Sequence, residues 1–256
     1  MLARDLIALH ESPREVPLFS ERYPGLTPQA GYAAAQALHE HRVARGWRAV
    51  GRKIGFTNRT IWPRYGVYEP IWGTVYDRTL IRAENNRARV RLEGLVNPRI
   101  EPEICFGLRT APDPKNLLQC IEWVAHSVEI VQCHHASWKL TLADSTADNG
   151  LHGRLVLGTP TAPPADMAER LPKATVELFR AGEAVDRGIG ANVLDSPLAA
   201  LAYVVDVLSK QGARPLAAGE IVTTGTMTDA HPVKPGETWS TRLSGLPLAG
   251  LTLEFE

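Results

Sequence analysis

Three glutamates on two strand-like segments are the residues with the clearest capacity for chemistry. Glu101 and Glu103 stand two positions apart in RIEPEICF, and Glu129 lies in the otherwise apolar segment SVEIVQC. Because successive side chains of a strand point to opposite faces, Glu101 and Glu103 share one face. The other face carries the apolar side chains Ile100, Pro102, Ile104 and Phe106. Neighbouring carboxylates repel each other, and a hard cation such as Mg2+ or Mn2+ relieves that repulsion. The pattern therefore predicts a divalent metal site with positions left open for water and substrate.

Each of these glutamates also has a plainer interpretation. Pro102 cannot donate a hydrogen bond to a sheet, so it predicts an edge strand or a bulge, where Glu101 and Glu103 could form a solvated polar face. An ionised Glu129 in an apolar strand is costly unless it is paired or ligates a metal, and an arginine could pair with it. The pattern of residues leaves both interpretations open.

Two further residues are candidates for acid/base work. Lys53 lies between Gly51 and Gly55 in GRKIGFT, and the glycines permit a strand or a ligand to approach closely. A lysine there could pair with a substrate carboxylate or transfer protons, although most single lysines are surface residues. Asp77 ends the run IWGTVYD and is a turn residue or a second acid/base group.

Other catalytic patterns find little support. His134 and His135 are adjacent, so on a strand they would point to opposite faces and could not easily hold one metal ion. HExxH, GxSxG, a phosphate-binding P-loop and a complete GxGxxG are all missing from the sequence. A serine hydrolase and a nucleotide-binding protein are therefore disfavoured.

Composition places the chain among ordinary globular proteins. Of its 256 residues, 44% are hydrophobic and 22% are charged, and 28 basic residues balance 28 acidic ones, so nothing favours nucleic acid or an anionic membrane. No run approaches the roughly 20 apolar residues of a membrane span, and the first residues lack the apolar core of a signal peptide. We expect a cytoplasmic protein whose cysteines are reduced and at least partly buried: Cys105, Cys120 and Cys133.

The chain divides into a helical start and a strand-rich remainder. Residues 1–47 read as helical, with Thr27 as a cap, Pro28 in the first turn and Gly46 as a stop. Short strand-like runs follow, interrupted by a helix over 195–212 and a second helix over 115–126. We predict an α+β fold in which residues 1–50 form a helical segment packed on the core. Residues 51–256 would form the catalytic domain, a rolled, mostly antiparallel β core.

Several of these segments occur together in a family order. The order is KIGFT, the run ending at Asp77, PRIEPEICF, VEIVQ, STADN, VLG, GEIVTTGTMT and VKPGETW. From about residue 20 to the C-terminus, the chain resembles the 2-keto-4-pentenoate hydratase family, which includes the 4-oxalocrotonate decarboxylases. This family belongs to the fumarylacetoacetate hydrolase superfamily.

The resemblance implies a fold, a cofactor and site residues. It implies the rolled mixed β-sheet of that superfamily, a bound Mg2+ or Mn2+, a small 2-oxo or 2-hydroxydienoic acid as substrate, and a homo-oligomer. The implied metal ligands are Glu101, Glu103 and Glu129. The implied catalytic groups are Lys53 and Asp77, and the implied substrate-binding residues are Thr226, Asn149 and His152.

The implied reaction is addition of water to a 2-hydroxy-2,4-dienoate, giving a 4-hydroxy-2-oxo acid, as in aromatic meta-cleavage catabolism. Decarboxylation of a 2-oxo-3-enedioate is the main alternative, because the same site could stabilise the same enolate. An acylpyruvate-type hydrolase is less favoured, since residues 142–146 (LADST) lack the lysine of that group. A non-catalytic binding module is the fourth interpretation, and the presence of Lys53 and Asp77 argues against it.

Overall fold

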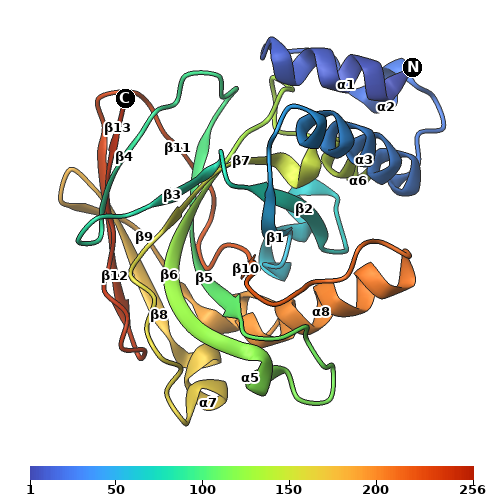
Figure 1. Ribbon diagram of the computed structural model, residues 1–256. Helices are drawn as coiled ribbons and strands as arrows, with labels where there is room; N and C mark the ends of the chain where they lie inside the picture. Colours follow the sequence, from blue (N-terminus) through green and yellow to red (C-terminus); the bar gives the residue numbers. More distant parts are fainter.

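The computed structural model describes residues 1–256, apart from the side chains of Ile61, Arg64 and Tyr65. A large mixed sheet runs through the middle of the molecule, and a smaller sheet packs against one side of it (Figure 1). The large sheet has the strand order β2 (Ile71–Tyr76), β1 (Ala49–Gly55), β10 (Ile221–Thr223), β5 (Arg99–Leu108), β6 (Ile121–Val131), β7 (His152–Leu157) and β3 (Leu80–Arg82), with β11 (His231–Pro232) also paired to β5. The smaller sheet has the order β4 (Arg87–Val90), β13 (Thr252–Phe255), β12 (Thr238–Ser244), β8 (Thr175–Arg180) and β9 (Glu183–Ile189).

Most strand pairs are antiparallel, as the short turn-separated strands predict. The parallel pairs are β1 with β10, β3 with β7, and β4 with β13. Strand β6 curves strongly beside β5, so the large sheet rolls around the middle of the molecule (Figure 1). The predicted α+β fold with a rolled mixed β core is confirmed.

The N-terminal segment is helical, as expected. Helices α1 (Leu2–Glu11), α2 (Phe19–Arg22) and α3 (Pro28–Ala44) lie together at one end of the molecule, beside α6 (Leu142–Ala147) (Figure 1). The hydroxyl of Thr27 accepts a 3.2 Å hydrogen bond from the N–H of Ala30, and Pro28 occupies the first turn of α3. These helices share a core with α6 through Leu6, Leu9, Phe19, Leu38 and Ala147. A domain boundary near residue 50 stays a prediction.

Helix α8 (Pro197–Lys210) covers one face of the large sheet. It confirms the helix predicted over 195–212, and the side chain of Ser196 caps it. Ile104 and Phe106 of β5 pack into the same core cluster. Ile100, farther along the same face of β5, packs between the two sheets. The apolar face of β5 thus packs against α8 and against the smaller sheet. The opposite face, which carries Glu101 and Glu103, is left for other contacts.

The remaining helical elements are short. They are α4 (Trp62–Tyr65), α5 (Leu117–Cys120), α7 (Met167–Arg170), η1 (Arg59–Ile61), η2 (Asn149–Leu151), η3 (Leu171–Lys173) and η4 (Gly190–Asn192).

Two expectations of local structure are wrong. The helix predicted over 115–126 is limited to the single turn α5, because residues from Ile121 onward pair with β5 as strand β6, and from Ser127 onward they pair with β7 as well. Strand β5 is not an edge strand: it pairs with β6 on one side and with β10 and β11 on the other. Pro102 lies between the residues of β5 that pair with β10 and those that pair with β11. Neither strand needs a backbone N–H donor at this position, so a proline is tolerated there.

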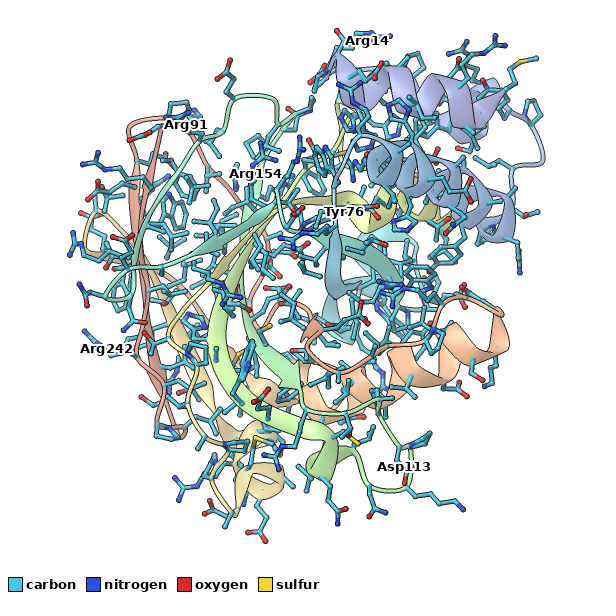
Figure 2. All side chains as sticks on the ribbon, in the orientation of Figure 1. Arg14, Tyr76, Arg91, Asp113, Arg154 and Arg242 are labelled. Atoms are coloured by element: carbon cyan, nitrogen blue, oxygen red, sulfur yellow. The ribbon has the colours of Figure 1, made fainter. Side chains whose placement is uncertain are left out.

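Charged side chains surround the core. Arg14, Arg91 and Arg242 lie at separate edges of the molecule, whereas Tyr76 lies in the interior (Figure 2). All three cysteines are free and buried, as expected of reduced thiols. Among the described residues, none of the helices combines the length and apolar character that crossing a bilayer requires.

Candidate active site

The pairing register of β5 and β6 brings the three predicted glutamates together. Glu101 lies directly opposite Glu129, and Glu103 lies two residues along the same face of β5. Carboxylate oxygens of all three lie within 4.8 Å of one another. Glu103 and Glu129 are fully buried and Glu101 is partly buried. The solvated-face interpretation is therefore wrong for these residues.

Lys53 completes the group from β1. Its Nζ lies 3.1 Å from Glu129 Oε2 and donates a 2.9 Å hydrogen bond to the carbonyl of Gly150. The side chain is 2% exposed, so the surface-lysine interpretation is also wrong. Burial alone would lower the pKa of Lys53, but the charges of Glu129, Glu101 and Glu103 outweigh it and raise the pKa. Lys53 is therefore an ammonium ion at neutral pH.

Glu103 is held by the loop that follows β10. Its Oε2 accepts hydrogen bonds from the hydroxyl of Thr223 and, at 2.9 Å, from the N–H of Gly225. Gly225 has φ +99°, and a Cβ there would lie 1.9 Å from the hydroxyl oxygen of Thr57, so this turn requires glycine. The other carboxylate oxygen, Oε1, is buried and has no hydrogen-bond partner among the described residues.

Glu129 is oriented by a histidine on β7. His152 Nδ1 lies 2.7 Å from Glu129 Oε1, and its Nε2 lies 2.8 Å from the hydroxyl oxygen of Thr79. Burial alone would raise the pKa of Glu129, yet Lys53 and His152 hold the pKa below its ordinary value. Glu129 is thus an ionised carboxylate with one partner on each oxygen.

The site carries more negative charge than the protein compensates. Three carboxylates face one lysine, which leaves two negative charges in excess when all the carboxylates are ionised. Burial raises the pKa of Glu101 to about 7, and burial together with the two neighbouring carboxylates raises the pKa of Glu103 well above its ordinary range. A divalent cation would remove this excess and give Glu103 Oε1 a partner, so the residues fit the predicted metal.

A cavity opens beside Lys53 and Glu101. Its wall is largely apolar, and Thr57, Asn58 and Thr226 add polar groups to the lining. The apolar side chains in the wall are Phe56, Ile71, Val131, Trp138, Leu140 and Leu151. A small acid could therefore place a polar end at the carboxylates and an apolar end against this wall.

Thr226 lies in the cavity lining, but its hydroxyl has other partners. It donates a 3.0 Å hydrogen bond to the carbonyl of Thr228 and accepts one from the N–H of the same residue. The predicted contact with a substrate carboxylate would require the Thr226 hydroxyl to turn toward the cavity.

Asn149 and His152 lie behind the cavity rather than in its wall. The Asn149 side chain accepts from the N–H of Thr74 at 2.9 Å and donates to its carbonyl at 3.0 Å, which ties the segment before β7 to β2. At Gly73, beside that contact, a Cβ would lie 2.1 Å from the carbonyl oxygen of Asn149. Their positions assign Asn149 and His152 to the support of Lys53 and Glu129, which corrects the expectation that they contact substrate.

Asp77 is not brought to the site. It follows the end of β2 that pairs with Ala49, roughly 13 Å along the strand from the level of Lys53. There it accepts hydrogen bonds from the backbone and the side chain of Arg48, both at 3.0 Å. Hydrogen bonds from Arg48 hold the pKa of Asp77 below its ordinary value. This placement corrects the interpretation of Asp77 as an acid/base group and supports its alternative as a turn residue.

Sequence comparison identifies curated relatives of the chain. No family model matches the chain. It is 30% identical to 2-keto-4-pentenoate hydratase of Paraburkholderia xenovorans, over 99% of this chain and 93% of that protein. It is 34% identical to a 4-oxalocrotonate decarboxylase of a Pseudomonas species, over 78% and 76% of the two chains.

Structural comparison gives the same neighbours. The structure of 4-oxalocrotonate decarboxylase from Pseudomonas putida G7, complexed with magnesium and adipate, matches with a TM-score of 0.89 and 25% identity, over 100% of this chain and 96% of that one. Fumarylpyruvate hydrolase from Pseudomonas aeruginosa, at a TM-score of 0.62 and 14% identity over 81% and 89%, shares the fold. The chain belongs to the family of 2-keto-4-pentenoate hydratases and 4-oxalocrotonate decarboxylases, enzymes of the lyase class with the fumarylacetoacetate hydrolase fold.

Proposed function

We propose that the protein is a metal-dependent hydratase that converts a 2-hydroxy-2,4-dienoate into a 4-hydroxy-2-oxo acid. The observation that carries this proposal is the buried group of Glu101, Glu103 and Glu129 with Lys53, at the edge of a cavity with an apolar wall. A hydratase 30% identical along nearly the whole chain supports the same reaction class.

The three glutamates would hold one divalent cation, Mg2+ or Mn2+. A bound cation of this kind acts as a Lewis acid that stabilises negative charge developing on the 2-oxo group of the substrate. Solved relatives complexed with magnesium and calcium support a divalent ion here.

Lys53 would carry out the proton transfers. Its ammonium group is fixed by Glu129 and the carbonyl of Gly150, and it lines the cavity. From there it can give a proton to C5 while the 2-hydroxyl group loses its proton to solvent, which converts the 2-hydroxydiene into a conjugated 2-oxo-3-enoate. The resulting amine can then take a proton from the water that adds at C4, while C3 gains a proton from solvent. His152 would keep Glu129 oriented, and Thr226 would approach the substrate carboxylate.

Decarboxylation of a 2-oxo-3-enedioate is the second candidate. The identity of 34% to a 4-oxalocrotonate decarboxylase favours it, but such a substrate carries a second carboxylate at its far end. Among the described residues lining the cavity, Lys53 is the one cationic side chain, and the rest of the wall is mainly apolar. An uncharged tail suits this wall better than a carboxylate.

The two activities can be separated directly. The Mg2+- or Mn2+-loaded enzyme is supplied with 2-hydroxypenta-2,4-dienoate or with 4-oxalocrotonate, and water addition and CO2 release are followed. We expect the hydration kcat/KM to exceed that of decarboxylation by tenfold or more. Faster CO2 release would establish the decarboxylase instead, and turnover of neither would reject both assignments. Light scattering on the same sample tests the further expectation of a homo-oligomer, and cell fractionation tests a cytoplasmic location.

A further inference from the structure

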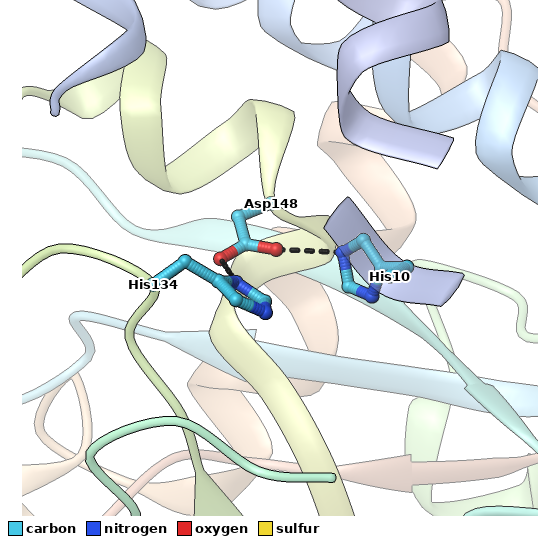
Figure 3. Close-up of side chains that lie close together, drawn as sticks. All are labelled: His10, His134 and Asp148. Carbon is cyan, nitrogen blue, oxygen red and sulfur yellow. Dashed lines mark hydrogen bonds and ion pairs between the residues drawn. The ribbon is translucent and has the colours of Figure 1, made fainter. Parts of the chain in front are cut away.

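Asp148 is a buried carboxylate outside the glutamate cluster, and it lies near the candidate active site. Its two oxygens each meet a histidine at 2.7 Å: Oδ1 meets His10 Nε2 of α1, and Oδ2 meets His134 Nδ1, which follows β6 (Figure 3). The side chains of Asp148 and His134 are 0% exposed and that of His10 is 6% exposed. The cluster joins three parts of the chain that are distant in sequence, since 138 residues separate His10 from Asp148.

Arg42 fixes how this cluster is protonated. Its Nη2 lies 3.0 Å from His10 Nδ1, and a guanidinium can only donate hydrogen bonds. His10 Nδ1 must therefore accept, so the ring proton of a neutral His10 is on Nε2 and is donated to Asp148. His134 donates from Nδ1 in the same way, and the positive charge of Arg42 balances the carboxylate.

Arg42 also disfavours a metal ion between His10, His134 and Asp148, although their ligand atoms lie within 4.8 Å of one another. A metal at His10 Nε2 would move the ring proton to Nδ1, where it would point at the N–H groups of Arg42. Both carboxylate oxygens are already used in short hydrogen bonds. The carboxylate of Asp148 is thus fully bound within the chain, although the buried atoms His134 Nε2 and Arg42 Nη1 have no hydrogen-bond partner among the described residues.

The position of Asp148 gives the cluster a consequence for the active site. Asn149, Gly150 and Leu151 follow it with φ values of 49°, 63° and 64°, and such a run in the left-handed region is costly for residues other than glycine. The carbonyl of Gly150 accepts the hydrogen bond from Lys53 Nζ. The surrounding contacts must therefore maintain this segment, and Asp148 is the anchored residue at its start.

We propose that Asp148, clamped by His10 and His134, is a positioning residue that holds the Gly150 carbonyl in place to orient Lys53. Helix α1 then contributes to catalysis through His10 without touching the substrate. The inference rests on the proposed function of Lys53. The clamp itself consists of contacts within the chain and can be tested without turnover.

The histidines allow donor-retaining and donor-removing substitutions. Asparagine places its amide N–H near the position of histidine Nδ1, and glutamine places its own near Nε2, so His134→Asn and His10→Gln keep a donor to Asp148. His134→Ala and His10→Ala remove it, and Asp148→Asn removes the charged acceptor. Glu11→Gln is the matched control, because Glu11 also joins α1 to α3, through His41 and Arg45, without reaching Asp148.

We expect Asp148→Asn, His134→Ala and His10→Ala to lower kcat about 10- to 100-fold, with the metal Kd within about threefold of wild type. His134→Asn, His10→Gln and Glu11→Gln should stay within about threefold of wild-type kcat. Hydrogen–deuterium exchange should rise at residues 149–152 in the donor-removing variants and not in the control. The exchange measurement tests the clamp even if neither proposed reaction occurs. A rise confined to residues 149–152 also distinguishes loss of the clamp from partial unfolding, which raises exchange throughout the chain.

Three results would overturn the inference. The first is wild-type kcat and exchange in Asp148→Asn and His134→Ala. The second is an equal loss in His134→Asn and His134→Ala, because the donor would then be irrelevant. The third is a second metal ion per chain, measured by elemental analysis of the wild type, that disappears in Asp148→Asn.

Discussion

Two buried carboxylate clusters lie on either side of the segment from Asn149 to Leu151, and the protein compensates them differently. At Asp148 each oxygen accepts a hydrogen bond, and Arg42 lies behind His10 as a countercharge. At the three glutamates Lys53 is the countercharge, and Glu103 Oε1 has no partner within the described structure.

The energetic cost of burial explains why this difference matters. A buried charge without full compensation is expensive, so a protein that retains one needs a ligand to make up the deficit. The glutamate cluster has that deficit and lies beside a cavity, whereas both carboxylate oxygens of Asp148 are hydrogen-bonded within the chain. We infer that the glutamate cluster binds a metal ion and that the Asp148 cluster positions the Gly150 carbonyl.

The largest effect is expected for Glu103→Gln, which keeps the shape of the side chain and removes one carboxylate. Metal affinity should fall by at least about 100-fold, beyond the loss typical of changes around a ligand. Turnover should fall by more than about 1000-fold. The metal-free variant should unfold at a higher temperature than metal-free wild type, because one of the mutually repelling buried charges is gone. Calorimetric titration with Mn2+ and thermal unfolding measure these changes.

Glu177→Gln is the control for Glu103→Gln, since Glu177 pairs with Arg242 on the smaller sheet. Near-wild-type metal binding and turnover in Glu103→Gln would exclude the metal site.

Lys53→Met should separate proton transfer from metal binding. The methionine fills similar space without a charge, so kcat should fall about 100- to 10,000-fold, as expected on loss of an acid/base group. The metal Kd should change by less than about tenfold, because all three glutamates remain. Steady-state rates and Mn2+ titration check both numbers, and an unchanged kcat would remove Lys53 from the mechanism.

The pH dependence of metal binding distinguishes the two clusters. In the metal-free protein the pKa of Glu101 is raised to about 7 and that of Glu103 lies well above its ordinary value, so both hold protons at mildly acidic pH. The cation must displace those protons, and affinity should rise with pH between about 6 and 8, up to about tenfold per unit for each proton released. The pKa of Asp148 is lowered, chiefly by His134 and His10 against the effect of burial, so it is already ionised there.

Asp148→Asn should therefore leave this pH slope unchanged. A metal affinity that does not vary with pH in the wild type would contradict the raised pKa values of the glutamates.

The smallest effect is expected for Asp77→Asn. Asp77 is bound to Arg48 at the surface and does not line the cavity, so kcat and metal affinity should stay within about twofold of wild type. A large loss of kcat with metal affinity retained would restore Asp77 to the catalytic group.

The residues that sequence reasoning identified are those whose positions follow from strand alternation. Glu101 and Glu103 share a face because they are two residues apart, and their meeting with Glu129 follows once β5 and β6 pair. The capped helices α3 and α8 were predictable for a similar reason, since the signals at Thr27 and Ser196 are local.

Partners that are distant in sequence could not be predicted. Asp148 and His10 carry no local signal that they meet. Asn149 and His152 were expected to contact substrate, because only the tertiary fold shows that their partners are Thr74 and Glu129. Thr223 and Gly225, which bind Glu103, were missed for the same reason, although the segment IVTTGT shows a strand ending at a glycine turn. Residues 121–126 joined a strand because pairing with β5 outweighed local preference.

The most direct test is anomalous X-ray diffraction from crystals of the protein grown with Mn2+. We expect one strong manganese peak per chain, with Glu101, Glu103 and Glu129 as its carboxylate ligands, and none at Asp148. An empty glutamate cluster, or a manganese ion held instead by His10, His134 and Asp148, would contradict it.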